Sequence, residues 1–382
     1  MAALALRHLF LLGALATAAS ATAGSGSCAA DGSNCAAPLP DSAYLTLKNG
    51  ATICRVLTGM WQLSGGHGYR PEQAAALADM EALVRAGFTT FDLADHYGPA
   101  EDFVGAFRAQ RREDASAPPP ARALQFHTKW VPRSGAMPVA TVRAALDVSR
   151  QRMKTPTLDL VAFHWWDYED KRYMQLLESA SLLRADGVLA AVSLTNFDTA
   201  RLRTILGAGV DVVSNQVSFS VVDTRPLDGG MAAVADAAGT KLLVYGTLLG
   251  GLLSDAWRGA PPPRREQLQA TASLGKYYQF VQAWGSWDLF QELLGAMHTV
   301  GQRHGGATIA NVAARWVLQQ RAVGGVILGM RLGHTAAQHI AENRKVFSFE
   351  LSGDDMRAIA AVQARGNRLL ESIGDCGDEY RG

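Results

Sequence analysis

The chain has 382 residues, of which 48% are hydrophobic and 19% are charged, and its formal net charge at pH 7 is +1. This composition is typical of a globular protein with a large core. The balanced charge argues against nucleic acid and anionic membrane surfaces as partners. The sequence therefore favours an enzyme or a small-molecule-binding domain.

The first 23 residues have the layout of a secretory signal peptide. Arg7 and His8 precede an apolar run over 9–16, and small residues at 21–23 suit cleavage. The apolar run is shorter than the roughly 20 residues of a membrane span. We therefore expect a secretory-pathway or extracellular protein for which a membrane is not required. A plastid or other organelle leader is the first alternative, and an uncleaved anchor is the second.

Residues 24–43 are rich in Ala, Ser, Gly and Pro and predict a linker. Within it, Cys28 and Cys35 could close a small loop in an oxidising compartment. Cys54 and Cys376 are the remaining thiols, and four thiols allow three pairings among which the sequence does not choose. We expect no metal, because no cluster of Cys or His has the spacing of zinc ligands.

A β-hairpin is predicted at 44–54, where two short apolar runs flank Asn49-Gly50, a dipeptide typical of tight hairpin turns. Beyond it, short apolar runs alternate with segments of helical periodicity. The long segment 247–285 contains several Gly and a triple Pro and is interpreted as a functional loop. The predicted strands cover 55–58, 89–92, 124–129, 158–163, 188–194, 212–216, 241–245 and 326–328.

Eight strands that alternate with helices predict a (β/α)8 TIM barrel. The strands are short and apolar throughout, as expected when both faces of a parallel sheet are buried. A doubly wound sheet is the alternative, but the Gly-x-Gly-x-x-Gly motif that it would carry after the first strand is missing. We therefore expect one barrel domain over 44–370, with the N-terminal β-hairpin, extra helices near the C-terminus and a tail over 371–382.

Three residues with reactive side chains, Asp92, Lys129 and His164, each come at the end of a predicted strand, and Tyr97 lies one short loop beyond Asp92. In a barrel the carboxyl ends of the strands share one face, so these four side chains are expected to share one pocket. Taken singly, each has a structural explanation, such as an ion pair or a packed ring. The prediction depends on their occurrence together.

Their chemistry is complementary. A phenol has a pKa of about 10, and the Lys129 ammonium is expected to lower that of Tyr97. Asp92 would hold the ammonium, and His164 could donate a hydrogen bond to a developing oxyanion. Such a set suits protonation of a carbonyl oxygen while a hydride arrives at the carbon.

The chain resembles the aldo-keto reductase family in a set of motifs spread over about residues 45–365. The motifs are Phe91-Asp92-Leu93-Ala94-Asp95-His96-Tyr97-Gly98 with Glu101, His127-Thr128-Lys129-Trp130, Ala162-Phe163-His164-Trp165, Val192-Ser193-Leu194-Thr195-Asn196-Phe197, Ser214-Asn215-Gln216, Val244-Tyr245-Gly246 and Ala341-Glu342-Asn343. The resemblance implies that Tyr97 is the proton donor, that Asp92 and Lys129 tune it, and that His164 orients the substrate carbonyl.

The resemblance also implies that the chain binds NADP(H) without a Rossmann fold. Thr195, Asn196 and Gln216 would hold the carboxamide, and Tyr245 would stack on the nicotinamide. Arg331 is the candidate partner of a 2′-phosphate, with a solvated loop arginine as the alternative. The pyrophosphate and the adenosine phosphate would lie along Gly246, Thr247, Leu248, Gly329, Met330, Arg331, Gln338, His339, Glu342 and Asn343.

Some positions depart from the family pattern. Leu328 stands where a Pro is usual, Gly246 and Thr247 replace a Ser-Pro pair, and His339 takes a place often held by Arg or Gln. These departures leave open the preference for NADPH over NADH more than they affect the chemistry.

Four tryptophans, Trp61, Trp130, Trp165 and Trp166, are expected to wall a pocket for a carbonyl compound with an apolar or sugar face. Core packing of two of them is the alternative. We expect an NADPH-dependent enzyme that reduces aldehydes or ketones to alcohols. A non-catalytic, nicotinamide-binding regulatory subunit on the same barrel is the alternative, and a sugar-phosphate barrel enzyme is the third hypothesis. The sequence names neither the physiological substrate nor the oligomeric state.

Overall fold

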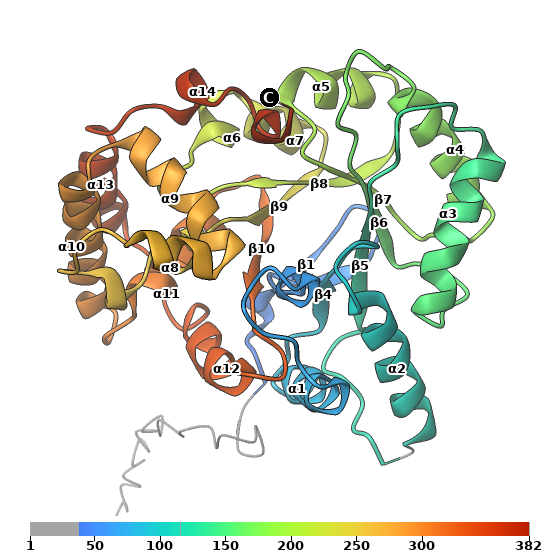
Figure 1. Ribbon diagram of the computed structural model, residues 1–382, viewed down its shortest axis with the longest axis horizontal. Coiled ribbons are helices and arrows are strands. Elements are labelled where there is room, and N and C mark those ends of the chain that lie inside the picture. The colour runs from blue at the N-terminus through green and yellow to red at the C-terminus, as the bar shows by residue number, and fades with distance from the viewer. Residues whose placement is uncertain (1–37, 115, 382) are drawn as a thin grey trace, which may run out of the picture.

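A computed structural model of the protein describes residues 38–114 and 116–381, so the predicted leader and most of the linker lie outside the described residues. Eight parallel strands close into a barrel, with helices arranged around it (Figure 1). The predicted (β/α)8 fold is confirmed. The barrel strands, in chain order, are β3 (Val56–Gly59), β4 (Thr90–Asp92), β5 (Gln125–Trp130), β6 (Leu160–Phe163), β7 (Val192–Thr195), β8 (Val212–Ser218), β9 (Lys241–Tyr245) and β10 (Val323–Gly329).

Each barrel strand pairs with its neighbours in sequence, and β10 closes the ring by pairing with β3 and β9. Every residue of β3, β4, β6, β7 and β8 is buried, including the polar residues of β8, so both faces of the parallel sheet are covered. The last strand begins earlier than predicted because it runs through Gly324 and Gly325, residue types that weaken any strand prediction. The predicted strand 188–194 is observed only from Val192.

The predicted hairpin is present as β1 (Tyr44–Thr46) paired antiparallel with β2 (Thr52–Cys54). Gly50 has a φ of 87°, which a side chain-bearing residue rarely adopts. Leu47 and Ile53 of this hairpin pack against inward-facing barrel residues that include Leu57. The hairpin therefore covers one end of the barrel and leaves the carboxyl ends of the strands for the site.

The helices follow from amphipathic patterns that bury one face against the strands. Asp198 caps α5 as predicted, because its side chain accepts a hydrogen bond from the Arg201 N–H at 2.7 Å. The helices are α1 (Gln73–Arg85), α2 (Ala100–Glu113), α3 (Val139–Arg152), α4 (Tyr173–Ala185), α5 (Thr199–Gly207), α6 (Arg225–Asp228), α7 (Met231–Ala237), α8 (Arg265–Ala270), α9 (Ala272–Trp284), α10 (Trp287–Arg303), α11 (Ile309–Leu318), α12 (Ala336–Lys345), α13 (Gly353–Gln363) and α14 (Leu369–Ser372).

The interpretation of 247–285 as a loop is wrong for its second half, which contains α8 and α9. Helix α9 buries Tyr277, Phe280, Val281 and Trp284, which lie at helical spacing, and Thr271 caps its first turn. The triple Pro and the glycines that precede this pattern obscured it.

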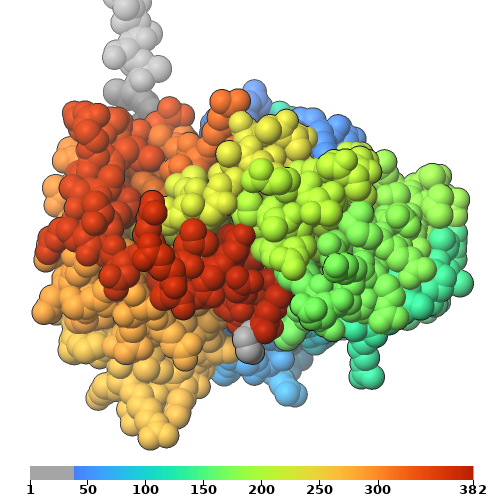
Figure 2. Space-filling view, turned by 90° about the horizontal axis from the view of Figure 1, so that it is seen from above, coloured from blue at the N-terminus to red at the C-terminus, as the bar shows by residue number. Residues whose placement is uncertain are grey.

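The C-terminal tail packs back onto the barrel instead of projecting from it. Figure 2 shows the red C-terminal segment lying between the orange helices and the green part of the chain. Cys376 in this tail is buried and free, as is Cys54, whereas Cys28 and Cys35 lie outside the described residues.

Over residues 38–114 and 116–381, no helix is both long and apolar enough to span a membrane. In the same part of the chain, no cluster of three His, Cys, Asp or Glu side chains could hold a metal ion.

Candidate active site

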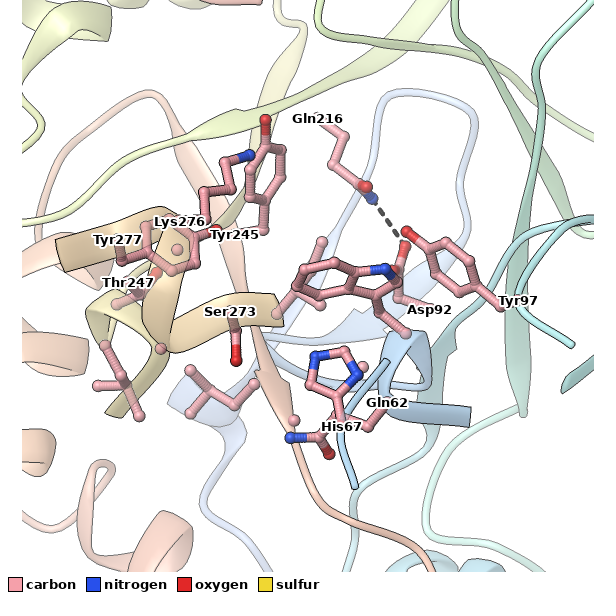
Figure 3. A pocket seen from close by; sticks show the side chains of 18 of the residues that line it. Gln62, His67, Asp92, Tyr97, Gln216, Tyr245, Thr247, Ser273, Lys276 and Tyr277 are labelled. Carbon is pink, nitrogen blue, oxygen red and sulfur yellow. Dashed lines mark hydrogen bonds between the residues drawn. The ribbon is translucent and has the colours of Figure 1, made fainter. Parts of the chain in front are cut away.

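A cavity of about 610 Å³ opens at the carboxyl ends of the barrel strands. Asp92, Tyr97, Lys129 and His164 all line it, although up to 72 positions of sequence separate them. In Figure 3, Tyr97, Asp92 and Gln216 lie on one side of the cavity and Tyr245 lies across from them. A concave site of this size with a few convergent polar groups is typical of a small-molecule site.

Lys129 and Asp92 form a buried ion pair at the base of the cavity. The Lys129 Nζ donates to both oxygens of Asp92, at 2.8 and 2.7 Å. Gln216 Nε2 donates to Asp92 Oδ1 at 2.7 Å, which is the dashed contact in Figure 3. Burial lowers the pKa of Lys129, and the Asp92 carboxylate opposes that effect. The Asp92 carboxylate therefore fixes the position of the Lys129 ammonium, and Gln216 fixes the position of the carboxylate.

Tyr97 lies on the loop after β4, with its ring centre 4.9 Å from Lys129 Nζ. The expected lowering of its pKa is not what the structure shows. Burial first, and then the charge of Asp92, raise the pKa of Tyr97 well above its usual value of 10.0. The main physical reason is burial, which disfavours the charged phenolate, and the negative charge of Asp92 adds to it. Near neutral pH the phenol therefore keeps its proton and can donate it.

His164 follows β6, and its backbone N–H donates to Trp130 O at 3.0 Å. Burial is the main cause that lowers the pKa of His164 to about 3, and the nearby cation of Arg381 is the next. The imidazole is therefore neutral in the physiological range and can donate one hydrogen bond without carrying a charge. Its Nε2 lies 3.4 Å from Asn196 Nδ2.

The residues predicted to hold a carboxamide converge on one wall of the cavity. Thr195, Asn196 and Gln216 all line it, and the Asn196 N–H donates to Gln216 O at 2.8 Å. Tyr245 Oη donates to Asn196 Oδ1 at 2.7 Å. Thr195 Oγ1 is buried without a hydrogen-bond partner among the described residues. A bound polar group would satisfy this oxygen.

The loop after β9 offers backbone rather than side chains to the cavity. Gly246 has a φ of 72°, and a Cβ there would lie 2.8 Å from the Tyr277 ring, so only glycine fits. Thr247 and Leu248 line the cavity beside it. Ser273, in the first turn of α9, completes this wall, where helical N–H groups favour an anion.

Some, but not all, of the residues predicted to bind the adenosine end of the cofactor line the cavity. Gly329, Arg331 and Gln338 line the cavity, but Glu342 and Asn343 do not. Asn343 is buried and its Nδ2 lies 3.1 Å from Met330 Sδ, so it supports the loop from behind. Glu342 Oε2 pairs with His339 Nδ1 at 3.1 Å, and His339 is the member of this pair that lines the cavity.

Two of the predicted tryptophans do not face the cavity. Trp165 is only 1% exposed, and its Nε1 donates to the carbonyl oxygens of Asp167 and Asp170 at 2.6 and 2.8 Å. Trp130 packs edge-on to Phe163. Trp61 lines the cavity as expected, together with Trp166, which is 49% exposed. Of the four tryptophans expected around the cavity, Trp61 and Trp166 therefore line it, and Trp130 and Trp165 do not.

The model of the aldo/keto reductase family matches residues 55–364 of the chain. The chain belongs to the aldo-keto reductase family. It is accordingly an oxidoreductase that uses a nicotinamide cofactor on small carbonyl compounds. An aldo-keto reductase of Mycolicibacterium smegmatis is 25% identical over 330 residues, which cover 86% of this chain and 96% of that protein.

Solved aldo-keto reductase structures share the fold at lower identity. The glycerol dehydrogenase AKR11B4 of Gluconobacter oxydans has a TM-score of 0.69 and 18% identity, covering 85% of this chain and 96% of its own. The holo form of AKR11C1 from Bacillus halodurans has a TM-score of 0.63 and 18% identity, covering 84% and 95%.

The residues present in this aldo-keto reductase fit a nicotinamide dinucleotide. The unpartnered Thr195 Oγ1 suits a carboxamide, and the Gly246 turn leaves room for a closely approaching phosphate. Arg331 N donates to Gln62 Oε1 at 2.8 Å, so a residue that the sequence analysis missed orients the predicted phosphate loop.

Several other lining residues were also missed: His67, His96, Lys276, Tyr277 and Tyr380. His67 packs edge-on to Trp61, and both of its ring nitrogens are buried without a partner among the described residues. Tyr380 comes from the tail, and its hydroxyl accepts a hydrogen bond from Lys276 Nζ at 2.5 Å. His96 lies inside the motif around Tyr97 but was not singled out there. No motif marks the other four positions, so only the folded chain reveals them.

Proposed function

We propose that the protein reduces aldehydes or ketones to alcohols with NADPH, and that Tyr97 donates the proton to the carbonyl oxygen. One observation carries this proposal: a protonated phenol lies in one cavity with a neutral imidazole and a buried Lys129–Asp92 pair. A general acid, a hydrogen-bond donor for the oxygen and a fixed cation are the groups that carbonyl reduction needs.

Bound NADPH would supply the hydride to the carbonyl carbon. His164, kept neutral, would hold the carbonyl oxygen through a ring N–H and direct it towards Tyr97. As negative charge develops on that oxygen, the Tyr97 proton would move to it and leave a phenolate. Lys129, 4.9 Å from the ring centre, would stabilise that phenolate, because opposite charges attract strongly in a buried site.

The preference for NADPH over NADH would come from the far end of the cavity. In the part of the chain that the structure describes, Arg331 has no carboxylate within ion-pair distance, and its guanidinium lies 5.3 Å from the centre of the Tyr69 ring. Such a guanidinium is free to pair with a 2′-phosphate. Thr335, Gln338 and His339 line the cavity beside it and add polar groups.

The test is NADPH consumption by the purified protein with a panel of aldehydes and ketones, comparing wild type with Tyr97→Phe. We expect Tyr97→Phe to lower kcat by about 10²- to 10⁴-fold while its Kd for NADPH is unchanged. Tyr44→Phe is the matched control, since it removes a phenol whose hydroxyl donates to Gly87 O away from the cavity. Near-normal turnover by Tyr97→Phe would contradict the assigned role.

A wild-type protein that quenches its tryptophan fluorescence on binding NADPH, yet turns over no carbonyl, would instead favour the regulatory subunit. We further propose that residues 1–23 are removed as a secretory leader. N-terminal sequencing of the mature protein tests this, and a chain that still begins at Met1 would contradict it.

A further inference from the structure

We propose that residues 375–381 of the C-terminal tail belong to the nicotinamide end of the site, and that Arg381 is the positioning residue that holds the loop carrying Asn196. This inference rests on the proposed function, because it takes Asn196 and Tyr245 as residues that contact the nicotinamide. Tyr380 of the tail lines the cavity, and its neighbours Arg381 and Glu379 contact Asn196 and Tyr245.

Arg381 contacts the loop after β7 at the backbone carbonyl of Asn196. Its Nη2 donates to the backbone carbonyl of Asn196, to Tyr168 Oη at 2.6 Å and to Trp165 O at 3.3 Å. Its guanidinium lies 3.8 Å from the centre of the Tyr168 ring. These three acceptors share the two N–H bonds of Nη2, while Nε and Nη1 have no hydrogen-bond partner among the described residues. Stacking on the Tyr168 ring and donation from Nη2 together hold the Asn196 carbonyl in place.

The Asn196 backbone has a φ of 57°, in the left-handed region that Asn adopts more readily than other residues with a side chain. Contacts to its carbonyl favour this conformation over the extended one. Gly377 of the tail packs on the same carbonyl, since a Cβ there would lie 2.2 Å from Asn196 O. Asp375 Oδ2 accepts a hydrogen bond from the Thr199 N–H at 2.8 Å, so the tail also holds the far end of this loop.

The tail is anchored on its other side by a buried charge network. Glu379 Oε2 accepts from Arg225 Nη1 at 2.8 Å, and Arg225 is also paired with Asp223 at 2.7 and 2.9 Å. None of the Arg225 side chain is exposed. Buried pairs of this kind are costly to break, so they favour one position of the tail. Glu379 Oε1 lies 3.3 Å from Tyr245 Oη and shares the single hydroxyl proton with the nearer Asn196 Oδ1.

These contacts join the tail to both sides of the predicted nicotinamide position. Tyr245 Oη donates to Asn196 Oδ1, and Arg381 and Glu379 hold Asn196 and Tyr245 respectively. Arg331, at the predicted adenosine end, makes none of its recorded contacts with the tail. A variant that loses these tail contacts should therefore bind the nicotinamide half of the cofactor more weakly and bind the adenosine half as the wild type does.

The experiment compares two ligands on the full-length protein by tryptophan fluorescence or calorimetry: NADPH, and 2′-phospho-ADP-ribose, which lacks the nicotinamide. We expect Arg381→Met to raise the Kd for NADPH about tenfold and to change that for the fragment by less than about twofold. The kcat should fall with it, and Arg381→Lys, which keeps one donor, should be intermediate. Arg357→Met is the matched control, because Arg357 is 75% exposed and, among the described residues, forms an ion pair only with the exposed Asp354.

The outcomes separate the two proposals. A wild type that binds neither ligand overturns the proposed function. A wild type that binds both, with an Arg381→Met variant that weakens both equally or neither, overturns the role of the tail and leaves the function standing. Tyr168→Phe removes a partner of Arg381 with a smaller change, so it repeats the test if Arg381→Met does not fold. Its expected result has the same direction, and an unchanged NADPH Kd would count against the inference.

Discussion

The ammonium of Lys129 lies 2.8 and 2.7 Å from the two carboxylate oxygens of Asp92, and both side chains are almost wholly buried. Burial, and then the charge of Asp92, raise the pKa of the neighbouring Tyr97 phenol, so the phenol keeps its proton near neutral pH. Each of the two buried charges is stabilised by the other, so removing one should destabilise the fold.

Lys129→Met should lower the free energy of unfolding by about 3–5 kcal/mol, because it leaves the Asp92 carboxylate buried without a counter-charge. Urea denaturation measures this. The double variant Asp92→Asn with Lys129→Met should recover part of the loss, since it removes both charges. A single variant as stable as wild type would show that the pair is not buried.

The Tyr97 pKa predicts how reduction depends on pH. A general acid works in its protonated form, and the pKa of Tyr97 is raised above 10.0 in the free protein. The kcat/KM for reduction, which reports groups of the free enzyme, should therefore not decline through this group below about pH 10. A pH profile at fixed NADPH tests this. A decline centred near neutrality that is lost in Tyr97→Phe would contradict it.

His127 should make the protein sensitive to acid. Burial, and then Lys129, lower its pKa from 6.5 to about 3, and neither ring nitrogen has a partner among the described residues. Between these two values the unfolded chain binds the proton and the folded chain does not. The free energy of unfolding is therefore lost as pH falls below about 6.5, by roughly 1.4 kcal/mol per pH unit from this residue.

Urea denaturation over this pH range measures the slope. His127→Gln should make it shallower by that amount, while His164, whose pKa is also about 3, keeps a slope of similar size. An unchanged slope in His127→Gln would argue that His127 is not neutral in the folded state.

Two adjacent tryptophans should separate substrate binding from stability. Trp166→Ala should raise the KM for carbonyl substrates with little change in stability, because Trp166 lines the cavity and is half exposed. Trp165→Phe should lower the free energy of unfolding by about 0.5–1.5 kcal/mol, since it removes the donor of two part-buried hydrogen bonds to the carbonyl groups of Asp167 and Asp170. Steady-state kinetics and urea denaturation on both variants measure the pair. The reverse pattern would show that Trp165 is the wall residue.

The sequence by itself determined the barrel and the four reactive residues. Strand-forming apolar runs and their spacing are local properties, and the barrel rule brings Asp92, Lys129 and His164 together wherever their strands end. The direction of the Tyr97 pKa shift did not follow from the sequence, because it depends first on how deeply the phenol is buried and then on how close the Asp92 charge lies.

Only the tertiary structure decided which neighbouring side chain faces the cavity and what the tail does. Trp165 and Trp166 are identical residues in adjacent positions, so no local pattern separates the buried one from the exposed one. Arg381 and Asn196 are 185 residues apart, and no local sequence pattern around either residue predicts their contact. Contacts of this kind arise when the closed ring of strands brings distant loops to one rim, where packing rather than periodicity selects the partners.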